Sequence, residues 1–404
     1  MMTRIVSEHG TKGGMETHAD ILIKNLIKNG HHISIITTKH PSGIEYSEEP
    51  GKKVYYLSTT VPGKYSGGWW KQSAKKFIEL QNKEHYDLIW SQSSGAFECI
   101  KKRNNPFGVP SVLICHGTLV SELKSIIKLT SSIRSMLSLL LKRIPMFLYH
   151  YLSKDLISIH RFNLIIAVSN ELRDNLRYGY FLSKNRISVI YNGIDLDLFQ
   201  PSNENRSKIR EKYEIQKDDK VLLVLGRIEK QKGMHLAILA MPEILQKYPN
   251  IKLLVVGTGS YLDSLKELVI NMSISDLVIF CGQISHEITY LYYCASDIFI
   301  NPTMCIEAFS LVTIEAMACG VPIVSTNLGA IKSIIENEKT GLLLSHTTAN
   351  DIAKNVIRIL SDQKLSDFIS LNAQKSAKER FNEEKMAEQT IKDFQEMIRT
   401  KKGN

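Results

Sequence analysis

One stretch, residues 298–325, constrains the fold more than any other part of the chain. It opens with an apolar run at 298–300 that is typical of a buried strand, and an Asn-Pro pair ends this run. Residues 310–319 have the composition of a short helix, which Gly320 can end in a left-handed cap. A second apolar run begins at residue 323. The stretch therefore predicts a strand–loop–helix–strand unit of a parallel sheet.

Two carboxylates flank the start of this expected helix. Glu307 lies in the loop before it, and Glu315 follows eight residues later, within the helix. The first helical turn has backbone N–H groups without intrahelical partners, and the helix dipole adds partial positive charge there. Carboxylates beside such a helix end suit a hydroxyl-rich ligand, because they accept strong hydrogen bonds from O–H groups. Taken alone, two glutamates are more often solvated surface residues, so this pair needs further support.

Length and composition predict a water-soluble globular protein with two domains. The chain has 404 residues, of which 43% are hydrophobic and 23% charged. It contains no apolar run of 18 residues, and its first residues lack the apolar segment of a signal peptide. Its six cysteines include no C-x-x-C motif, which favours reduced thiols. We therefore expect a cytoplasmic protein.

The net charge of +10 is unevenly distributed along the chain. Residues 1–200 carry 26 basic and 16 acidic side chains, whereas residues 201–404 carry 25 of each. A basic first half predicts an anionic partner, and no nucleic-acid-binding motif accompanies it. We expect an acidic membrane face or a phosphate-bearing acceptor instead.

The first half begins with an expected strand–helix–strand unit at residues 4–7, 15–29 and 33–37. Gly13 and Gly14 lie in the turn before the helix, where missing Cβ atoms let a ligand approach the backbone closely. The glycine spacing differs from the dinucleotide-binding fingerprint, which disfavours an NAD-dependent oxidoreductase. A purely structural role in the turn is an equally good interpretation of the glycine pair.

Two further features of the first half have competing interpretations. His116 directly follows an apolar strand at 111–115, and a residue at this end of a parallel strand faces the ligand crevice. A hydrogen-bonded structural histidine is the alternative. Trp69 and Trp70 could face a sugar ring, but packing in the core is the stronger expectation.

Residues 119–148 combine bulky apolar side chains with basic ones, and Pro145 divides the run into two expected helices. The basic residues are Lys124, Lys128, Arg134, Lys142 and Arg143. Such a pattern is typical of helices that bind the surface of an anionic membrane. An ordinary helical cover on the sheet explains it equally well, and both interpretations stay open here.

The second half repeats the strand–helix rhythm after a polar linker near residue 200. Arg227 and Lys232 follow an apolar strand at 221–225, between Gly226 and Gly233. An arginine fork and a lysine charge together suit a diphosphate, although an isolated basic loop is more often only solvated. The Asp-x-Asp motif that begins at Asp195 could suggest a metal site, but its place in an Asn-Gly turn favours a capping role.

Five separated motifs now resemble one family in the same order along the chain. They are G-G-M-E from Gly13, His116, N-G-I-D at 192–195, G-R-x4-K-G at 226–233, and Glu307-x7-Glu315. Together they resemble the retaining GT-B glycosyltransferases of family 4, over residues 4 to about 345. The resemblance implies an α/β fold with two Rossmann-like domains facing across a cleft. It also implies a last helix that crosses back to the first domain.

The resemblance also implies the domain ranges and the partners. An acceptor domain would span residues 1–200, a nucleotide-sugar donor domain residues 201–375, and the returning helix residues 376–404. The expected partners are a nucleotide-diphosphate sugar and a saccharide or lipid-linked acceptor. The family needs neither a cofactor nor a bound metal, so none is expected here. The protein would be cytoplasmic or peripheral on the inner face of the membrane, as in cell-surface polysaccharide assembly.

Site residues are likewise carried over from the family motifs. The positions expected to act in catalysis are His116, Arg227, Lys232 and Glu307. The positions expected to bind the donor are Gly13, Gly14, Gly282, Gln283, Ile284, Phe309, Ser310, Leu311 and Glu315. The resemblance implies that the two cations neutralise the leaving diphosphate, that Glu307 holds the sugar and Glu315 the ribose. It further implies that residues 282–284 border the base.

This sequence departs from the family at two places. Ser310 stands where the family usually has Gly, and Gly329-Ala330-Ile331-Lys332-Ser333 replaces a common Gly-Gly-x-x-Glu. These changes leave the donor sugar open. Two other functions also stay open: a nucleotide-sugar epimerase or hydrolase of the same fold, and a non-catalytic subunit that binds sugar nucleotides. Neither is favoured. Such epimerases lack the pair of motifs Glu-x7-Glu and G-R-x4-K-G in this form, and a silent subunit would be signalled by loss of Arg227, Lys232 or Glu307, which are all retained.

Overall fold

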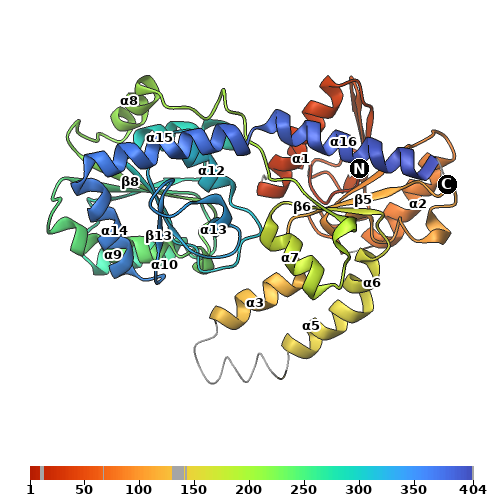
Figure 1. The fold of residues 1–404 in the computed structure, drawn as a ribbon, viewed down its shortest axis with the longest axis horizontal. Coiled ribbons are helices and arrows are strands. Elements are labelled where there is room, and N and C mark those ends of the chain that lie inside the picture. Colours follow the sequence, from red (N-terminus) through yellow and green to blue (C-terminus); the bar gives the residue numbers. More distant parts are fainter. Residues whose placement is uncertain (10–12, 67, 130–140, 142, 403–404) are drawn as a thin grey trace. The chain divides into compact units, whose positions relative to one another are not determined.

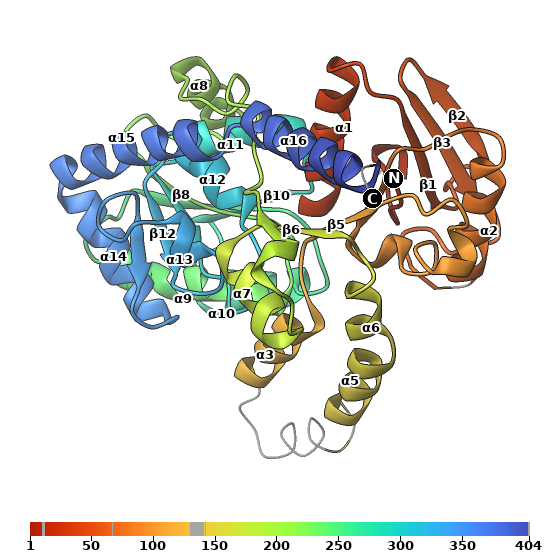
Figure 2. The ribbon, with the colours of Figure 1, turned by 45° about the vertical axis from the view of Figure 1, so that its right-hand side comes forward.

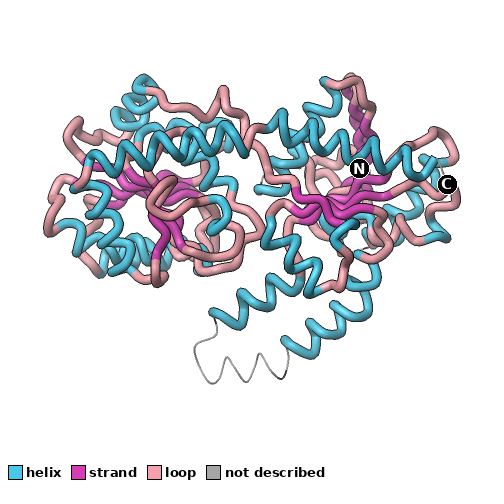
Figure 3. The backbone as a smooth tube through the Cα atoms, in the orientation of Figure 1, coloured by secondary structure: helices cyan, strands magenta, loops and turns pink. Residues whose placement is uncertain are grey.

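The computed structural model of the protein describes residues 1–9, 13–66, 68–129, 141 and 143–402. The chain forms two compact units (Figure 1): unit 1 comprises Met1–Gly193 with Glu383–Asn404, and unit 2 comprises Ile194–Asn382. In each unit, helices lie on both sides of the strands (Figure 3). The expected two-domain α/β class with parallel sheets is confirmed. The domain boundaries expected at residues 200 and 375 stay predictions.

Unit 1 contains two sheets, with the strand orders β1-β3-β2 and β4-β5-β6-β7. The strands are β1 (Ile33–Thr38), β2 (Tyr46–Glu49), β3 (Lys52–Leu57), β4 (Ile89–Gln92), β5 (Ser111–Cys115), β6 (Leu164–Ala167) and β7 (Ile187–Val189). The main helices are α1 (Gly14–Lys28), α2 (Trp69–Gln81), α3 (Leu119–Leu129), α5 (Ile144–His150), α6 (Leu156–Ile159), α7 (Asn170–Gly179) and α16 (Glu383–Lys402). Trp69 is fully buried and donates to the carbonyl of Gly95, so its expected place in the core is confirmed.

The strand expected at residues 4–7 is wrong. Met2 forms parallel bridges to Ile36 of β1 and Ser91 of β4, and residues Ser7–His9 form a short 3-10 helix, η1. The backbone pairing thus occurs earlier in the chain, where Met2 N–H donates to the carbonyl of Trp90 over 2.9 Å. The edge strand β2 was not expected either, because its polar sequence lacks an apolar alternation.

The helices after β5 lead away from the strands of unit 1 in both views (Figures 1 and 2). They are α3, α5, a π-helical turn η5 (Tyr151–Asp155) and α6. Pro145 occupies the first turn of α5, where its missing N–H costs no hydrogen bond. Residues 130–140, which include Arg134, and Lys142 lie outside the described part of the chain. Among the residues that are described, no helix combines the length and apolar content that crossing a bilayer requires.

Helix α16 belongs to unit 1 and packs against α1. Glu384 pairs with Lys28 over 3.3 Å, and the ring of Phe394 lies 6.1 Å from that of Trp90. The return of the last helix to the first domain, expected from the family resemblance, is therefore confirmed.

Unit 2 has one six-stranded sheet with the order β10-β9-β8-β11-β12-β13, in which all neighbours pair in parallel. The strands are β8 (Lys220–Leu225), β9 (Ile251–Val256), β10 (Val278–Gly282), β11 (Ile298–Asn301), β12 (Ile323–Thr326) and β13 (Leu342–Leu344). The helices are α8 (Asn203–Lys212), α9 (Met234–Leu245), α10 (Leu262–Asn271), α11 (Thr289–Ala295), α12 (Leu311–Ala318), α13 (Ile331–Ile334), α14 (Ala349–Ser361) and α15 (Gln363–Arg380). Counted within the unit, the order is 3-2-1-4-5-6, which reverses between β8 and β11. Ligands of such sheets bind outside the carboxyl ends of the strands at the reversal.

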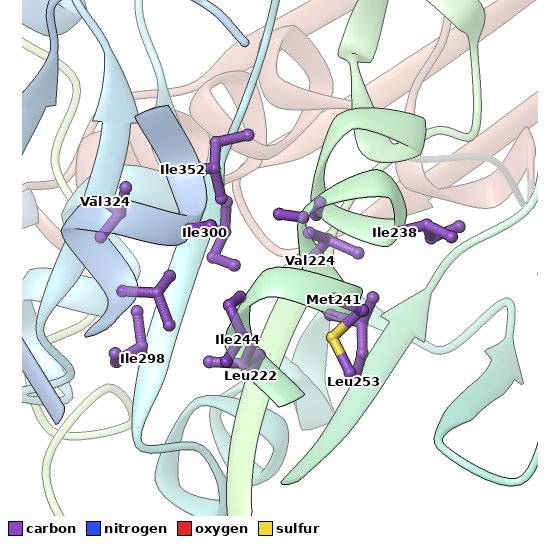
Figure 4. Close-up of a cluster of buried hydrophobic side chains, with 14 of the residues drawn as sticks. Leu222, Val224, Ile238, Met241, Ile244, Leu253, Ile298, Ile300, Val324 and Ile352 are labelled. Carbon is purple, nitrogen blue, oxygen red and sulfur yellow. The ribbon is translucent and has the colours of Figure 1, made fainter. Parts of the chain in front are cut away.

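The core of unit 2 fixes this arrangement (Figure 4). Leu222 and Val224 of β8 and Ile298 and Ile300 of β11 are at most 1% exposed, and α9 contributes the equally buried Met241. Strands covered on both faces need such continuous apolar runs, which the sequence of β8 supplies. The two strands at the reversal are therefore held rigidly side by side.

Candidate active site

An ion pair joins the loops that follow β8 and β11. Lys232 ends the 3-10 helix η7 (Lys230–Lys232) after β8, and Glu307 lies in the loop between β11 and α12. Their Nζ and Oε1 atoms are 2.5 Å apart. Burial disfavours the ammonium charge, but the adjacent Glu307 carboxylate outweighs this effect and raises the pKa of Lys232. Lys232 is thus a permanent cation at neutral pH.

Two glycines let the backbone close around this ion pair. A Cβ on Gly233 would lie 2.0 Å from the carbonyl oxygen of Pro302, and one on Gly329 would lie 2.5 Å from that of Glu307. Both glycines have positive φ angles, +70° and +56°. The amide of Ala330 also donates to the Glu307 carbonyl over 3.1 Å. The loops after β8, β11 and β12 therefore position both charged side chains through backbone contacts.

Arg227 lies in the same region, two residues beyond the end of β8. Its side chain is exposed, whereas the preceding Gly226 approaches the backbone of Gly257 so closely that a Cβ on Gly257 would lie 1.9 Å from the Gly226 carbonyl. The structure thus places Arg227 and Lys232 in one loop at the carboxyl end of β8, as the sequence predicted. Their roles toward a ligand stay predictions.

The start of α12 is held by a buried polar network rather than by a capping side chain. The hydroxyl of Ser310 accepts from Asn301 Nδ2 over 3.2 Å and from Thr313 Oγ1 over 2.9 Å. Ser310 is buried and has φ −124°, so this position does not require glycine. The serine that replaces the family's usual glycine is therefore accommodated without backbone strain. Its hydroxyl is directed toward Asn301 and Thr313.

Glu315 is fixed from two sides on α12. Its Oε1 lies 2.8 Å from Nε2 of His286, and its Oε2 accepts from the hydroxyl of Tyr293 over 2.9 Å. Glu315 is only 1% exposed, which rules out the alternative of a solvated surface residue. Burial and the nearby carboxylate hold the pKa of Tyr293 well above its usual value, so its hydroxyl stays a donor.

The other expected donor-binding residues of unit 2 lie at the carboxyl ends of β10 and β11. Gly282 ends β10 with φ +72°, and a Cβ there would meet no atom within 4 Å. Gln283 and Ile284 follow in the loop, exposed and half-buried respectively. Phe309 and Leu311 flank Ser310 at the start of α12, and the Phe309 ring packs edge-on against Phe381 at 5.9 Å. Their contacts with a ligand stay predictions.

In unit 1, the glycine turn is built around a carboxylate. Gly13 N–H donates to Oε2 of Glu16 over 3.1 Å, and Oε1 of Glu16 lies 3.6 Å from Nε of Arg4. Gly14 is the first residue of α1, and both glycines are exposed. Because Gly13 has φ −127°, the turn does not require glycine for its backbone conformation. The backbone of this turn is therefore accessible because both glycines are exposed, and not because the backbone is strained.

His116 forms a cluster with two residues that the sequence did not single out. Its Nε2 lies 2.6 Å from Oε1 of Gln92 at the end of β4, and its ring packs edge-on against His18 of α1 at 4.9 Å. Burial lowers the pKa of His18 to about 4. Burial, followed by the charges of His18 and Arg4, holds the pKa of His116 well below its usual value. Both imidazoles are therefore neutral at pH 7.

The Asp-x-Asp motif forms a turn, as its sequence context predicted. Oδ1 of Asp195 accepts from the backbone N–H groups of Asp197 and Leu198, each over 3.0 Å. Within the described ranges, no three His, Cys, Asp or Glu side chains are grouped to hold a metal ion.

Sequence reasoning missed His18, Gln92, His286 and Tyr293. Of these four, His286 had the clearest signal in the sequence, because it closely follows Gly282. It begins the 3-10 helix η8 (His286–Ile288) after the carboxyl end of β10. His18, Gln92 and Tyr293 become visible only when α1, β4 and α11 are placed in the fold, since no motif contains them.

Models of two glycosyltransferase families match adjoining parts of the chain. The model described as "Glycosyltransferase Family 4" matches residues 12–198, and that described as "Glycosyl transferases group 1" matches residues 205–376. The chain is a family 4, group 1 glycosyltransferase. It is therefore an enzyme that transfers a sugar from a nucleotide sugar, and the family expected from the motifs is confirmed.

Relatives of this glycosyltransferase match it over nearly the full length. An uncharacterized glycosyltransferase of Methanocaldococcus jannaschii is 27% identical over 388 residues, which are 94% of this chain and 93% of that protein. N-acetyl-alpha-D-glucosaminyl L-malate synthase of Bacillus anthracis is 25% identical over 398 residues, or 97% and 96% of the two chains.

Two solved structures share the fold. Sucrose-phosphate synthase of Thermosynechococcus elongatus superimposes with a TM-score of 0.82 at 24% identity and covers 98% of both chains. Anabaena HepE, solved in complex with UDP and glucose, has a TM-score of 0.70 at 19% identity, over 97% of this chain and 98% of its own. At these identities the likeness shows the fold alone.

The loop that contains Gly329 gives a first prediction. Gly329→Ala adds a Cβ that meets the Glu307 backbone, whereas Gly282→Ala adds one in open space at a similar positive φ. Since both variants carry the same left-handed backbone cost, we expect Gly329→Ala to lower the free energy of unfolding by about 2 kcal/mol more than Gly282→Ala. Urea denaturation of the two variants measures this difference. Equal losses would show that the loop adapts without strain.

The buried histidine His18 gives a second prediction. Its native pKa of about 4 lies below the unfolded value of 6.5, so unfolding takes up a proton between these two pH values. The stability of the neutral form is therefore complete above pH 6.5 and is lost as the pH falls toward 4. Between pH 7 and pH 5, wild type should lose about 2 kcal/mol more than His18→Leu. Urea denaturation at both pH values tests this, and parallel losses would contradict it.

Proposed function

We propose that this enzyme transfers the sugar with retention of anomeric configuration, from a nucleotide-diphosphate sugar to a hydroxyl of a saccharide or lipid-linked acceptor. The observation that carries the proposal is the Lys232–Glu307 ion pair beside Arg227 and the start of α12. This site combines two cations, which can neutralise a leaving diphosphate, with a carboxylate and helix N–H groups, which can bind sugar hydroxyls.

In this reaction Lys232 has two tasks at once. Its ammonium group has three hydrogens, so it can keep its bond to Glu307 and also donate to a phosphate oxygen. Arg227, exposed in the same loop, supplies a second cation. Because their charges neutralise the diphosphate as it leaves, we expect the reaction to need no divalent metal ion.

The proposed step breaks the bond between the anomeric carbon and the phosphate oxygen. The acceptor oxygen forms the new bond on the same face of the sugar, and its proton moves to the leaving phosphate. Lys232 stays protonated throughout, since Glu307 stabilises its charge. Catalysis would consist of positioning and of electrostatic stabilisation, with no side chain acting as nucleophile.

Apolar side chains on the helices after β5 support a membrane-bound acceptor. Those that are exposed include Ile127, Met146, Leu148, Tyr149 and Leu152. Buried cover helices would hide such residues, whereas helices bound at a lipid surface insert them between head groups. The basic residues within 119–148 complement an anionic membrane. We therefore propose that the enzyme is peripheral on the inner face of the cytoplasmic membrane.

The charge clamp is tested by removing each cation. Lys232→Ala and Arg227→Ala should each lower turnover at saturating donor by about 100-fold or more, because a charge that stabilises the transition state is lost. Lys230→Ala is the matched control, since Lys230 is an exposed lysine of the same 3-10 helix, and it should stay near the wild-type rate. Near-wild-type turnover of both clamp variants would refute the proposed roles.

Membrane attachment is tested by sedimentation with vesicles. Wild type should bind vesicles that contain anionic lipid at low salt, and binding should weaken at higher salt because exposed charges are screened over about 10 Å at 0.1 M. Changing Lys124, Lys128, Arg134, Lys142 and Arg143 to Gln should release the protein while donor binding persists.

The matched control for the vesicle experiment changes five exposed lysines of unit 2 to Gln, namely Lys247, Lys354, Lys364, Lys375 and Lys378. It removes the same charge, so equal release by both variants would indicate only a net-charge effect. If wild type does not bind anionic vesicles at low salt, the helices after β5 are only a cover on the sheet, and the acceptor is soluble.

A further inference from the structure

Two hydrogen-bonding groups of the protein hold the carboxylate of Glu315. His286 lies 2.8 Å from Oε1, and Tyr293 donates to Oε2 over 2.9 Å. A carboxylate offers about four acceptor directions, two on each oxygen. Among the described residues, one direction on each oxygen is therefore taken by a protein donor, and one on each remains. Such a group is suited to two neighbouring hydroxyls, one on each oxygen.

The two donors differ in their access to solvent. Tyr293 is completely buried, and the Glu315 side chain is 2% exposed, whereas the His286 side chain is 29% exposed. Of the three side chains, that of His286 therefore has most of the contact with solvent. The ring of His286 is also fixed on its other side, because Phe199 packs against it with ring centroids 5.6 Å apart.

We propose that His286 is a positioning residue that makes Glu315 selective for a vicinal diol, the 2′,3′-diol of the donor's ribose. This rests on the proposed function, and on the ribose position at Glu315 that the family resemblance implies. With Glu315 ionised, Nε2 of His286 carries the hydrogen of the bond to Oε1. This bond holds Oε1 in one orientation, so that both oxygens meet a diol at once. Without it, Oε1 would be free to turn or to bind water instead.

Calorimetric titration with ribose and 2′-deoxyribose nucleotides tests the proposal. The probes are UDP, GDP and ADP, followed by the 2′-deoxy form of whichever binds. Wild type should bind the ribose form at least tenfold more tightly than the deoxy form. His286→Leu removes the donor and should reduce this ratio to threefold or less. His286→Gln supplies an amide N–H near the position of Nε2 and should restore most of the preference.

The ratio distinguishes positioning from a general loss of structure. A misfolded fraction lowers the amount of active protein for both nucleotides alike, so it leaves the ratio of dissociation constants unchanged. His346→Leu is the matched control, because it makes the same chemical change at an exposed histidine after β13 and should keep the wild-type ratio.

Each result has a distinct meaning. An unchanged ratio in His286→Leu, or a wild type without ribose preference, would overturn the role of His286 while leaving the glycosyltransferase function intact. If none of the three nucleotides binds wild type, the proposed donor site itself is wrong. A ratio that falls in His286→Leu and returns in His286→Gln would support the proposal.

Discussion

The ion pair between Lys232 and Glu307 is the contact on which the candidate active site depends. The two residues are 75 positions apart in the sequence, and the reversal of strand order between β8 and β11 brings them together. A long lysine side chain alone would not fix this geometry. The backbone does so, because Gly233 and Gly329 allow carbonyl groups to approach at distances that any Cβ would block. A purely solvated basic loop would need neither glycine.

The two glutamates of the Glu-x7-Glu motif have different surroundings and thus suit different tasks. Glu307 faces a cation, which keeps Lys232 charged beside the place where we propose that a diphosphate leaves. Glu315 faces His286 and the neutral Tyr293, which fix its orientation. A carboxylate held in this way is specific for hydrogen-bond donors, whereas one paired with lysine supports a developing charge. Both tasks are served at one helix, because Glu307 lies in the loop before α12 and Glu315 lies within α12.

Much of this arrangement could be predicted from the sequence, and the failures have physical reasons. Apolar runs identified the buried parallel strands of unit 2, and the motifs placed Lys232 and Glu307 at the ends of two of them. The strand expected at residues 4–7 was wrong. The β-bridges form at Met2, because their position depends on the pairing partners Ile36 and Ser91 and not on local composition. His18 and His286 escaped notice because their partners, His116 and Glu315, come from distant segments. Ser310 looked like a departure that could alter the site, yet its hydroxyl lies in the network under α12.

The central claim is that these residues break the bond between a sugar and a nucleotide diphosphate with retention. Proton NMR of the purified enzyme with UDP-, GDP- and ADP-sugars tests it most directly, with a chelator present and no acceptor. We expect one α-linked donor to be slowly hydrolysed and the α-anomer of the free sugar to appear first, before mutarotation. First release of the β-anomer would contradict retention. The absence of any hydrolysis, for donors that calorimetry shows to bind, would contradict the proposed chemistry of the site.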